Sequence, residues 1–419
     1  MRLQKTGFRY KYTSIIMFLY CLSIVAATFV RWLNWFNVAL LIIILLSYLK
    51  RGISYRFIPS VLWSTFIFAY PICDVAMRGA NGLSLYNLLR YLTPMLFLLA
   101  NVELDNYGNI FIMFVKYFAW FQAFGVFLER VWSRAYILLA WRILGMWSYG
   151  VTGFATDATI TAYILCFAIG WYLIEYWLII EKKEKRAWKK LICAAILFGA
   201  MILTNKRSLL VGMIGGLILV FLGQSFRSWR KMWKTLGGSV IVVVSGVNLC
   251  LGAYHMGMNN ALSRMGETFI GLSRGDDVTS MRSVWAAYMN EWRKGSEVLG
   301  IGWGNFSSML SQTSYAGKVP NGHNVYKQIL CEEGYVGEMI FVLLLAVVII
   351  FAVKSVIVLS KKNNIRILSF AMFAMFSIVL FAIYCYSGNA IYDTVIYAYF
   401  FAAIQLLAAV NKSQKRFDL

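Results

Sequence analysis

Residues 335–359 read YVGEMIFVLLLAVVIIFAVKSVIVL, and only Glu338 and Lys354 among them carry a charge. A helix that crosses a bilayer needs about 20 predominantly apolar residues, so this stretch predicts a transmembrane helix. The segment just before it, residues 255–336, is the longest polar segment of the chain. We therefore expect a membrane domain that carries one large polar loop beside this helix.

Further apolar runs fill most of the remaining chain. Hydrophobic residues make up 60% of the sequence and charged residues 14%, whereas a soluble domain has about a quarter charged residues. We predict an all-α polytopic membrane protein with about 12 transmembrane helices. The expected helices span residues 13–30, 35–49, 57–75, 85–99, 110–128, 158–180, 191–204, 209–222, 236–254, 335–359, 367–386 and 394–410.

The expected organisation is a single membrane domain over residues 1–419. Residues 255–336 form a helical extracytoplasmic loop between the ninth and tenth helices, and this loop is predicted to carry the active site. Residues 131–147 are apolar but contain Arg134 and Arg142. We interpret this segment as an interfacial or re-entrant helix on the outer face. A helix packed over the bundle is the alternative.

Lysine and arginine gather in alternate loops. The net charge is +22, and the positive-inside rule accounts for it without nucleic acid as a partner. With twelve helices, the basic segments fall on one side of the bilayer: residues 2–11, 50–56, 182–190, 227–234, 361–366 and 412–416. Both termini are therefore predicted to be cytoplasmic, and the loop over residues 255–336 to face outward.

Three charged residues lie inside expected helices: Lys116, Glu175 and Lys354. Each lies toward the predicted cytoplasmic end, where a long side chain can reach the headgroups. A transporter would be indicated by charged pairs at mid-depth and by broken helices in both halves. A polytopic transporter of lipid-linked glycans stays open as an alternative because the number of helices alone fits it.

Two sets of cations on the predicted outer side depart from the positive-inside pattern. Lys206 and Arg207 follow Asn205 in the tight turn between the seventh and eighth helices. Arg282 begins an amphipathic pattern in the outer loop, beside the apolar stripe that contains Trp285. Anion binding at a helix start is the functional interpretation. Ordinary headgroup contact is the alternative for each.

His323 is one of only two histidines in the chain and lies in the polar outer loop. Imidazole exchanges protons near neutral pH, so we predict acid–base chemistry there. The other histidine, His255, is expected at the membrane interface. Asp276 and Asp277 are adjacent rather than spaced, so no metal site and no cofactor is predicted.

The run HNVYKQILCEEGYVG at residues 323–337 resembles the signature of O-antigen polymerases and O-antigen ligases. LGIGWGNF at residues 299–306 is similar to the glycine-rich turn of that family, and TNKRSLL at residues 204–210 resembles its short motif around an arginine. Arg282 and Trp285 resemble its arginine–tryptophan helix. Lys206 stands where the family often has a small residue.

The resemblance implies an inverting, metal-independent glycosyltransferase of the bacterial cytoplasmic membrane. Its donor would be an oligosaccharide on undecaprenyl pyrophosphate, and its acceptor another glycan. His323 would be the catalytic base. The candidate substrate-binding residues are Arg207, Arg282, Lys206, Asn324 and Tyr326, and the candidate structural residues are Trp285, Glu332, Gly334 and Gly337.

We predict a repeat-unit polymerase for a surface polysaccharide such as O-antigen, capsule or exopolysaccharide. A ligase that transfers the finished glycan to lipid A-core or another acceptor is the alternative within the family. A polysaccharide flippase and a chain-length regulator are the expected protein partners.

Overall fold

The computed structural model describes most of the chain after residue 56. The described residues are 15, 17–25, 28, 42–43, 46, 57–78, 98–99, 103–143, 151–182, 187–226, 228–274, 282–313, 322–362 and 364–417. Most of the expected helices at 35–49 and 85–99, and part of the one at 13–30, lie outside them. Statements about the fold below refer to the described part of the chain.

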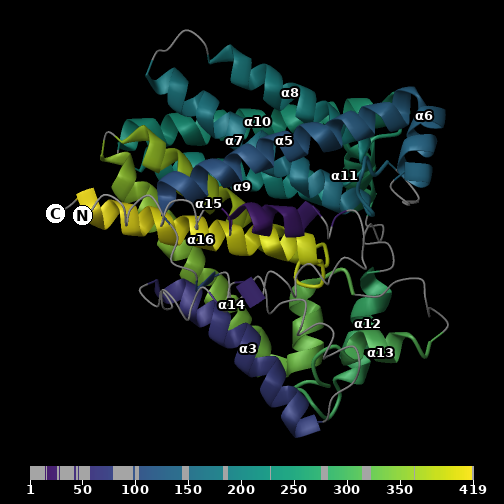
Figure 1. Ribbon diagram of the computed structural model, residues 1–419. Coiled ribbons are helices and arrows are strands. Elements are labelled where there is room, and N and C mark those ends of the chain that lie inside the picture. Colours follow the sequence, from purple (N-terminus) through teal and green to yellow (C-terminus); the bar gives the residue numbers. More distant parts are fainter. Residues whose placement is uncertain are drawn as a thin grey trace.

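Helices account for all the regular structure described, and no strand occurs there (Figure 1). The helices are α3 (Ile58–Arg78), α5 (Leu104–Val131), α6 (Ser133–Ile137), the π-helix η2 (Leu138–Ile143), α7 (Ala158–Glu181), α8 (Trp188–Leu203), α9 (Arg207–Ser225), α10 (Trp229–His255), α11 (Ala261–Arg274), α12 (Arg282–Trp292), α13 (Asn305–Leu310), α14 (Val325–Ser360), α15 (Ile365–Cys385) and α16 (Thr394–Phe417).

Seven of the described helices are long and apolar enough to cross a membrane. They are α5, α7, α9, α10, α14, α15 and α16. This confirms an all-α multi-pass membrane protein. The helices expected at residues 57–75 and 191–204 are also present, as α3 and α8. The number twelve, the sidedness of the loops and the division into a membrane domain and a loop subdomain stay predictions.

Helix α15 lies at the centre of the bundle and packs against α7, α9, α14 and α16. Its candidate span is 89% buried inside the protein. Close packing depends on glycine at Gly170 of α7, where a Cβ atom would lie 2.2 Å from the ring of Phe376. The rings of Phe167, Phe373 and Tyr399 complete this aromatic layer. By contrast, only 11% of the candidate span in α10 is buried.

Helix α7 packs against α5, α8 and α9, and α10 packs against α9 (Figure 1). One end of the bundle is here called the polar end. It contains the first residues of α7, α9, α14 and α16 and the last residues of α8, α10 and α15. The other ends of these helices carry Lys189, Arg230, Lys361 and Arg366 and form the basic end.

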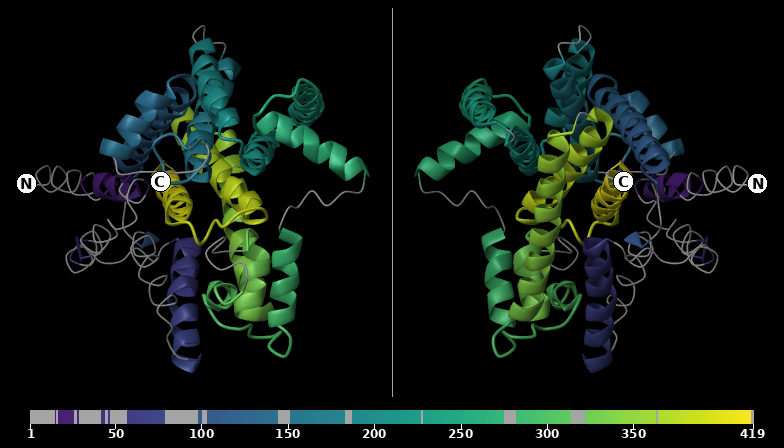
Figure 2. Two further views of the ribbon diagram at one scale, coloured as in Figure 1. Left: turned by 90° about the vertical axis from the view of Figure 1, so that its right-hand side faces the viewer. Right: turned by 90° about the vertical axis from the view of Figure 1, so that its left-hand side faces the viewer.

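The segment between α10 and α14 folds onto the polar end. Helix α11 packs against α10, whereas α12 and α13 pack against the first part of α14, and α3 lies on the other side of α14 (Figure 2). Trp285, Met289, Phe306, Leu310 and Cys331 form a small separate core there. The segment between α10 and α14 therefore has a packed interior of its own.

Helix α14 begins at Val325, ten positions earlier than the sequence prediction of residue 335 (335 − 325 = 10). The helix is interrupted at Gly334, which has φ 63° and ψ −166°. The transmembrane stretch quoted above therefore starts directly after the interruption. Backbone groups that lose their helical hydrogen bonds at the kink bind the backbone of residues 297–302 instead.

The segment expected to be interfacial, residues 131–147, forms α6 and η2 as far as Ile143. No residue of α6 is buried, and 64% of the Trp132 side chain is exposed. Both features agree with a helix on the surface of the bundle. Trp147 lies outside the described residues.

Candidate active site

Four helix starts bring polar residues together at the polar end. Asp157 is the N-cap of α7, Lys206 precedes α9, Arg282 is the first residue of α12, and Asn324 is the N-cap of α14. The electrostatic fields of Arg282, Lys206 and Asp157 all act on His323. The structure therefore brings Arg282 and Lys206 within electrostatic reach of His323, and the roles of these residues at a site stay predictions.

His323 is held by the side chain of Asn389, in the loop between α15 and α16. The backbone N–H of His323 donates to Asn389 Oδ1 at 2.8 Å, and Asn389 Nδ2 lies 3.3 Å from His323 Nδ1. His323 also has φ 53°, in the left-handed region that non-glycine residues rarely occupy. The amide clamp stabilises this uncommon backbone and fixes the ring beside it.

The hydrogen bond from the His323 backbone fixes the orientation of the Asn389 amide, and this orientation determines which group donates in the contact with Nδ1. Because Asn389 Oδ1 accepts the backbone N–H, the amide nitrogen of Asn389 faces Nδ1 of the ring. An amide nitrogen is only a donor, so Nδ1 acts as the acceptor and a neutral imidazole carries its proton on Nε2.

The pKa of His323 is lowered from its ordinary value of 6.5 by burial, and next by the positive charges of Arg282 and Lys206. The negative charge of Asp157 opposes them. The imidazole is therefore neutral at pH 7 and able to accept a proton.

Lys206 and Asp157 form an ion pair, with Lys206 Nζ 3.7 Å from Asp157 Oδ1. Burial raises the pKa of the Asp157 carboxyl, but the charge of Lys206 and the hydrogen bonds from Thr159 outweigh it and hold this pKa below 3.8. Asp157 also caps α7 by accepting from the backbone N–H of Thr159 at 2.5 Å. Lys206 is thus tied to the start of α7.

Arg282 is half-buried at the start of α12, and no carboxylate of the described residues forms an ion pair with it. Burial lowers the pKa of its guanidinium, while Tyr384 and Tyr386 of the α15 end act in the opposite direction. A guanidinium fork that is partly removed from water and lacks a carboxylate suits a phosphate or pyrophosphate group.

Arg207 turns toward α11 rather than toward His323. Its Nη1 donates to the hydroxyl of Thr268, and it lies 3.4 Å from the backbone carbonyl of Arg264. Its charge still interacts with that of Arg282. Arg207 is therefore at the rim of the site, where its present contacts hold α11 against α9.

Asn324 and Tyr326, predicted to bind substrate, make structural contacts. Asn324 Oδ1 accepts from the backbone N–H of Lys327 at 3.0 Å and so caps α14. The hydroxyl of Tyr326 donates to the carbonyl of Ala382 on α15 at 2.9 Å. Both contacts position the start of α14, and with it His323. A direct role in substrate binding stays a prediction for both residues.

Glu332 is fully buried and joins α14 to the start of α16. Its carboxylate accepts from Tyr392 Oη at 2.6 Å and from Gln328 Nε2 at 3.1 Å. The backbone N–H groups of Gly304 and Phe306 also bind it. These contacts join α13, α14 and the segment before α16, and the structural role of Glu332 at the site stays a prediction.

Gly334 allows the loop before α13 to touch the backbone of α14. A Cβ atom on Gly334 would lie 2.3 Å from the carbonyl oxygen of Val298, and one on Gly300 would lie 2.4 Å from that of Glu332. The kink is stabilised by hydrogen bonds from Gly302 N to Glu332 O at 2.7 Å and from Tyr335 N to Glu297 O at 3.0 Å. Glycine is required here on steric grounds.

Trp285 and Gly337 are both buried. Trp285 is 1% exposed in the small core between α12, α13 and α14, and Gly337 lies in α14 just after the kink. Trp285 anchors α12, so it fixes the place where Arg282 begins that helix.

The described residues contain no cluster of three histidine, cysteine, aspartate or glutamate side chains suited to a metal ion. Asp276 and Asp277 lie outside the described part of the chain. Metal independence stays a prediction.

Sequence reasoning missed Asn389 and Asp157. Asn389 lies in the run SGNA, a polar interruption between the last two apolar stretches. Asp157 precedes the apolar run of α7, where an aspartate followed by such a run indicates a helix cap. Each of these sequence features indicates a turn on the predicted outer side. Neither indicates that the turn lies next to His323.

Residues 192–342 match the model of a protein family described as O-antigen ligase. This segment runs from α8 into α14 and contains Arg207, Arg282 and His323. It confirms, over less than half of the chain, the resemblance stated from the motifs. No curated protein matches the chain.

Proposed function

We propose that this protein is a repeat-unit polymerase for a surface polysaccharide. It transfers a glycan from undecaprenyl pyrophosphate to a sugar hydroxyl at the outer face of the bacterial cytoplasmic membrane. The observation that carries the proposal is a neutral imidazole, His323, near the guanidinium of Arg282, which forms no ion pair with a described carboxylate. Both residues lie within the segment that matches the O-antigen ligase family.

The proposed reaction is a single displacement at the anomeric carbon. The acceptor hydroxyl oxygen forms the new C–O bond as the C–O bond to the pyrophosphate breaks, and the anomeric configuration inverts. The hydroxyl proton moves to His323, and the bonding electrons leave with undecaprenyl pyrophosphate. Arg282 binds the charge that develops on the leaving group, with Lys206 and Arg207 adding to the positive field.

The contact with Asn389 constrains how His323 takes the proton. In the observed arrangement Nδ1 accepts from Asn389, so Nε2 already carries a proton. For Nε2 to act as the base, the ring proton must stand on Nδ1 instead, and the Asn389 amide must rotate so that its oxygen accepts from Nδ1–H and releases the backbone N–H of His323. We propose that acceptor binding drives this rotation, which makes Asn389 a positioning residue for the base.

A ligase is the second candidate because the matching family is described as O-antigen ligase. Polymerase and ligase use the same bond changes and differ in the acceptor. A transporter of lipid-linked glycans would leave the glycosidic bond intact, so chemical transfer separates that alternative from both enzymes.

The decisive experiment uses the purified full-length protein in nanodiscs with a lipid-linked repeat unit. A polymerase produces a ladder of products that differ by one repeat unit. A ligase yields a single transfer only when lipid A-core or another acceptor is added. Absence of any transfer product with either acceptor, together with movement of the intact lipid-linked glycan across the bilayer, would favour the transporter.

The proposed location places the polar end outside the cell and both termini in the cytoplasm. Lys294 and Lys189 are exposed residues near opposite ends of the bundle. In a cysteine-free background, Lys294→Cys should react with an impermeant reagent from outside and Lys189→Cys should not. The reverse labelling would contradict the orientation. A flippase that supplies the donor and a chain-length regulator are the proposed partners.

A further inference from the structure

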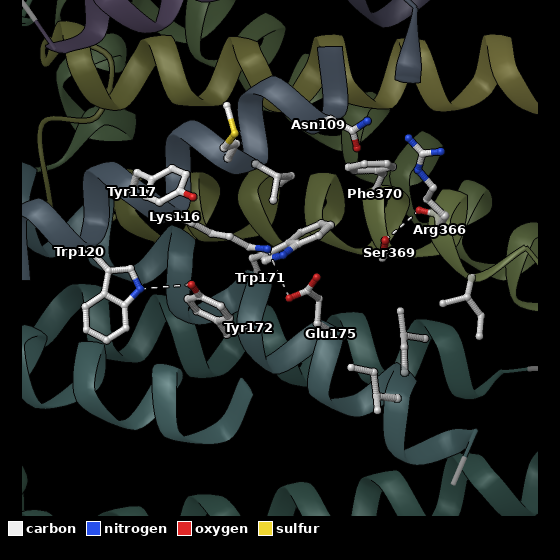
Figure 3. A pocket seen from close by; sticks show the side chains of 15 residues that line it. Asn109, Lys116, Tyr117, Trp120, Trp171, Tyr172, Glu175, Arg366, Ser369 and Phe370 are labelled. Atoms are coloured by element: carbon white, nitrogen blue, oxygen red, sulfur yellow. Dashed lines mark hydrogen bonds and ion pairs between the residues drawn. The ribbon is translucent and has the colours of Figure 1, made fainter. Parts of the chain in front are cut away.

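A second cluster of charged and aromatic side chains lines a cavity of about 620 Å³ between α5, α7 and α15, near the basic end. Figure 3 shows Lys116, Trp171, Tyr172 and Glu175 around this cavity, with Arg366 at one side. It is separate from the candidate active site because its residues lie at the opposite ends of the same helices. Lys116 and Glu175 stand out in the sequence only as charges inside apolar runs, and none of the motifs that resemble the O-antigen family contains a residue of this cavity.

The charges in this cavity do not cancel. Glu175 Oε2 lies 3.6 Å from Lys116 Nζ and 2.7 Å from Lys190 Nζ, so two ammonium groups share one carboxylate. Arg366 is paired with Asp105 at 3.2 Å. Among the described residues, this leaves one positive charge in excess, shared by Lys116 and Lys190. Lys116 Nζ also lies 5.4 Å from the ring centre of Trp171 and 5.5 Å from that of Tyr172.

Trp171 supplies a buried donor. It is 5% exposed, and its indole N–H has no hydrogen-bond partner within the described part of the protein. Figure 3 shows its ring beside the ammonium group of Lys116. Buried N–H groups are rarely left unsatisfied. A donor without an acceptor beside an uncompensated ammonium group fits an anionic oxygen ligand.

An apolar track leads away from this charged cluster along α5. Met113, Tyr117, Phe121 and Phe124 are 55%, 71%, 42% and 58% exposed and recur on one face of the helix. From Met113 to Phe124 the helix rises about 16 Å at 1.5 Å per residue. One leaflet of the hydrocarbon core is about 15 Å thick, so the track has the length of one acyl layer.

We propose that this cavity binds one anionic phospholipid from the leaflet at the basic end. Its phosphate oxygens accept from the ammonium of Lys116 and from the indole N–H of Trp171. One acyl chain lies along the exposed face of α5. The residual positive charge favours phosphatidylglycerol over a zwitterionic lipid, and the predicted cytoplasmic leaflet is where basic groups meet anionic headgroups.

The experiment measures lipid binding to the full-length protein in detergent by native mass spectrometry. We expect phosphatidylglycerol to bind at least about tenfold more tightly than phosphatidylcholine. Lys116→Gln and Trp171→Phe should each weaken phosphatidylglycerol binding by about tenfold, since each removes one donor to a charged oxygen. Trp171→Phe retains the aromatic ring and so preserves the packing.

Lys354→Gln is the matched control because Lys354 is an exposed lysine in α14 that does not line the cavity. It should bind phosphatidylglycerol like the unmodified protein. Unchanged binding in both cavity variants, or equal binding of the two lipids by the unmodified protein, would overturn the proposal. Displacement of phosphatidylglycerol by millimolar inorganic phosphate would assign the site to a free anion instead. Glycan transfer is not needed for any of these measurements, so this proposal and the proposed function can fail separately.

Discussion

The two ends of the bundle organise their charges in different ways. At the basic end, Lys116 and Lys190 share the carboxylate of Glu175. At the polar end, Arg282 has no carboxylate among the described residues, and His323 is held by a neutral amide. The cations at the basic end thus keep a carboxylate within 4.0 Å, whereas the guanidinium at the polar end has none among the described residues and lies near a neutral imidazole, where it can bind an anionic group of a substrate.

His323→Ala tests this contrast with the largest expected effect. Removal of a general base slows transfer by about 10² to 10⁴-fold. Ladder formation by purified protein measures it. His255→Ala is the matched control, since His255 ends α10 and is expected to retain activity. Transfer at the unmodified rate in His323→Ala, with both proteins equally folded, would remove His323 from the reaction.

Arg282→Lys separates a guanidinium fork from a simple positive charge. Lysine keeps the charge but loses bidentate binding to phosphate, so we expect transfer to fall about 10- to 100-fold. The transfer rate should fall less in Arg207→Lys, because Arg207 already binds Thr268 and the Arg264 carbonyl. Arg274→Lys, at the exposed end of α11, is the control. Full activity of Arg282→Lys would show that charge alone suffices.

Asn389 tests how the neutral clamp sets the state of His323. Asn389→Asp provides two acceptor oxygens, which bind the backbone N–H and Nδ1–H together and leave Nε2 free as the base. The Asn389→Asp variant should therefore retain the transfer rate near neutral pH. In Asn389→Ala the transfer rate should fall about tenfold because the imidazole ring is misplaced. An aspartate that is as impaired as alanine would mean that His323 acts as a donor through Nε2.

Lys206→Met should alter the pH profile more than the maximal rate. Lys206 lowers the pKa of His323, and its loss also leaves Asp157 without its cation. Both changes raise this pKa, so more of the imidazole is protonated at a given acidic pH. Activity should therefore decline at a higher pH than in the unmodified protein, whose decline begins below the ordinary value of 6.5. Rates between pH 5 and 8 measure the shift, and a decline at lower pH in the variant would contradict it.

Chelation of divalent metal ions should leave the transfer rate unchanged, which is the smallest effect expected. We expect transfer to survive excess EDTA without added Mg²⁺ or Mn²⁺, since cationic side chains rather than a metal face the pyrophosphate in the proposed site. Loss of activity with EDTA and its return with a divalent ion would make Asp276, Asp277 and Glu332 the next residues to replace.

The sequence motifs named candidate site residues but could not give the geometry between them, and the roles of these residues stay predictions. Lys206, Arg282 and His323 were expected from motifs, and the structure brings them together. Arg207 was expected beside them and instead binds α11. Asn389 was not expected, because its contact with His323 joins positions 66 residues apart.

Apolar runs are a local property of the chain, and they sufficed to predict the all-α membrane class. The distribution of lysine and arginine is local too, and the outward orientation that it predicts for the loop over residues 255–336 stays a prediction. The start of α14 at Val325 escaped such reasoning because its first turns are polar. They form a helix supported by the Asn324 cap and by the carboxylate of Glu332. The kink at Gly334 depends on backbone hydrogen bonds from residues 297–302.

The sequence by itself determined which residues are apolar enough to cross the bilayer and which cations stand apart from the positive-inside pattern. Only the tertiary structure decided that Asn389 clamps His323, that Asp157 binds Lys206 and that Lys116 meets Glu175. The physical reason is that hydrophobicity acts on each segment separately. Hydrogen bonds and ion pairs require contact within a few ångströms, and helix packing alone sets which distant segments achieve it.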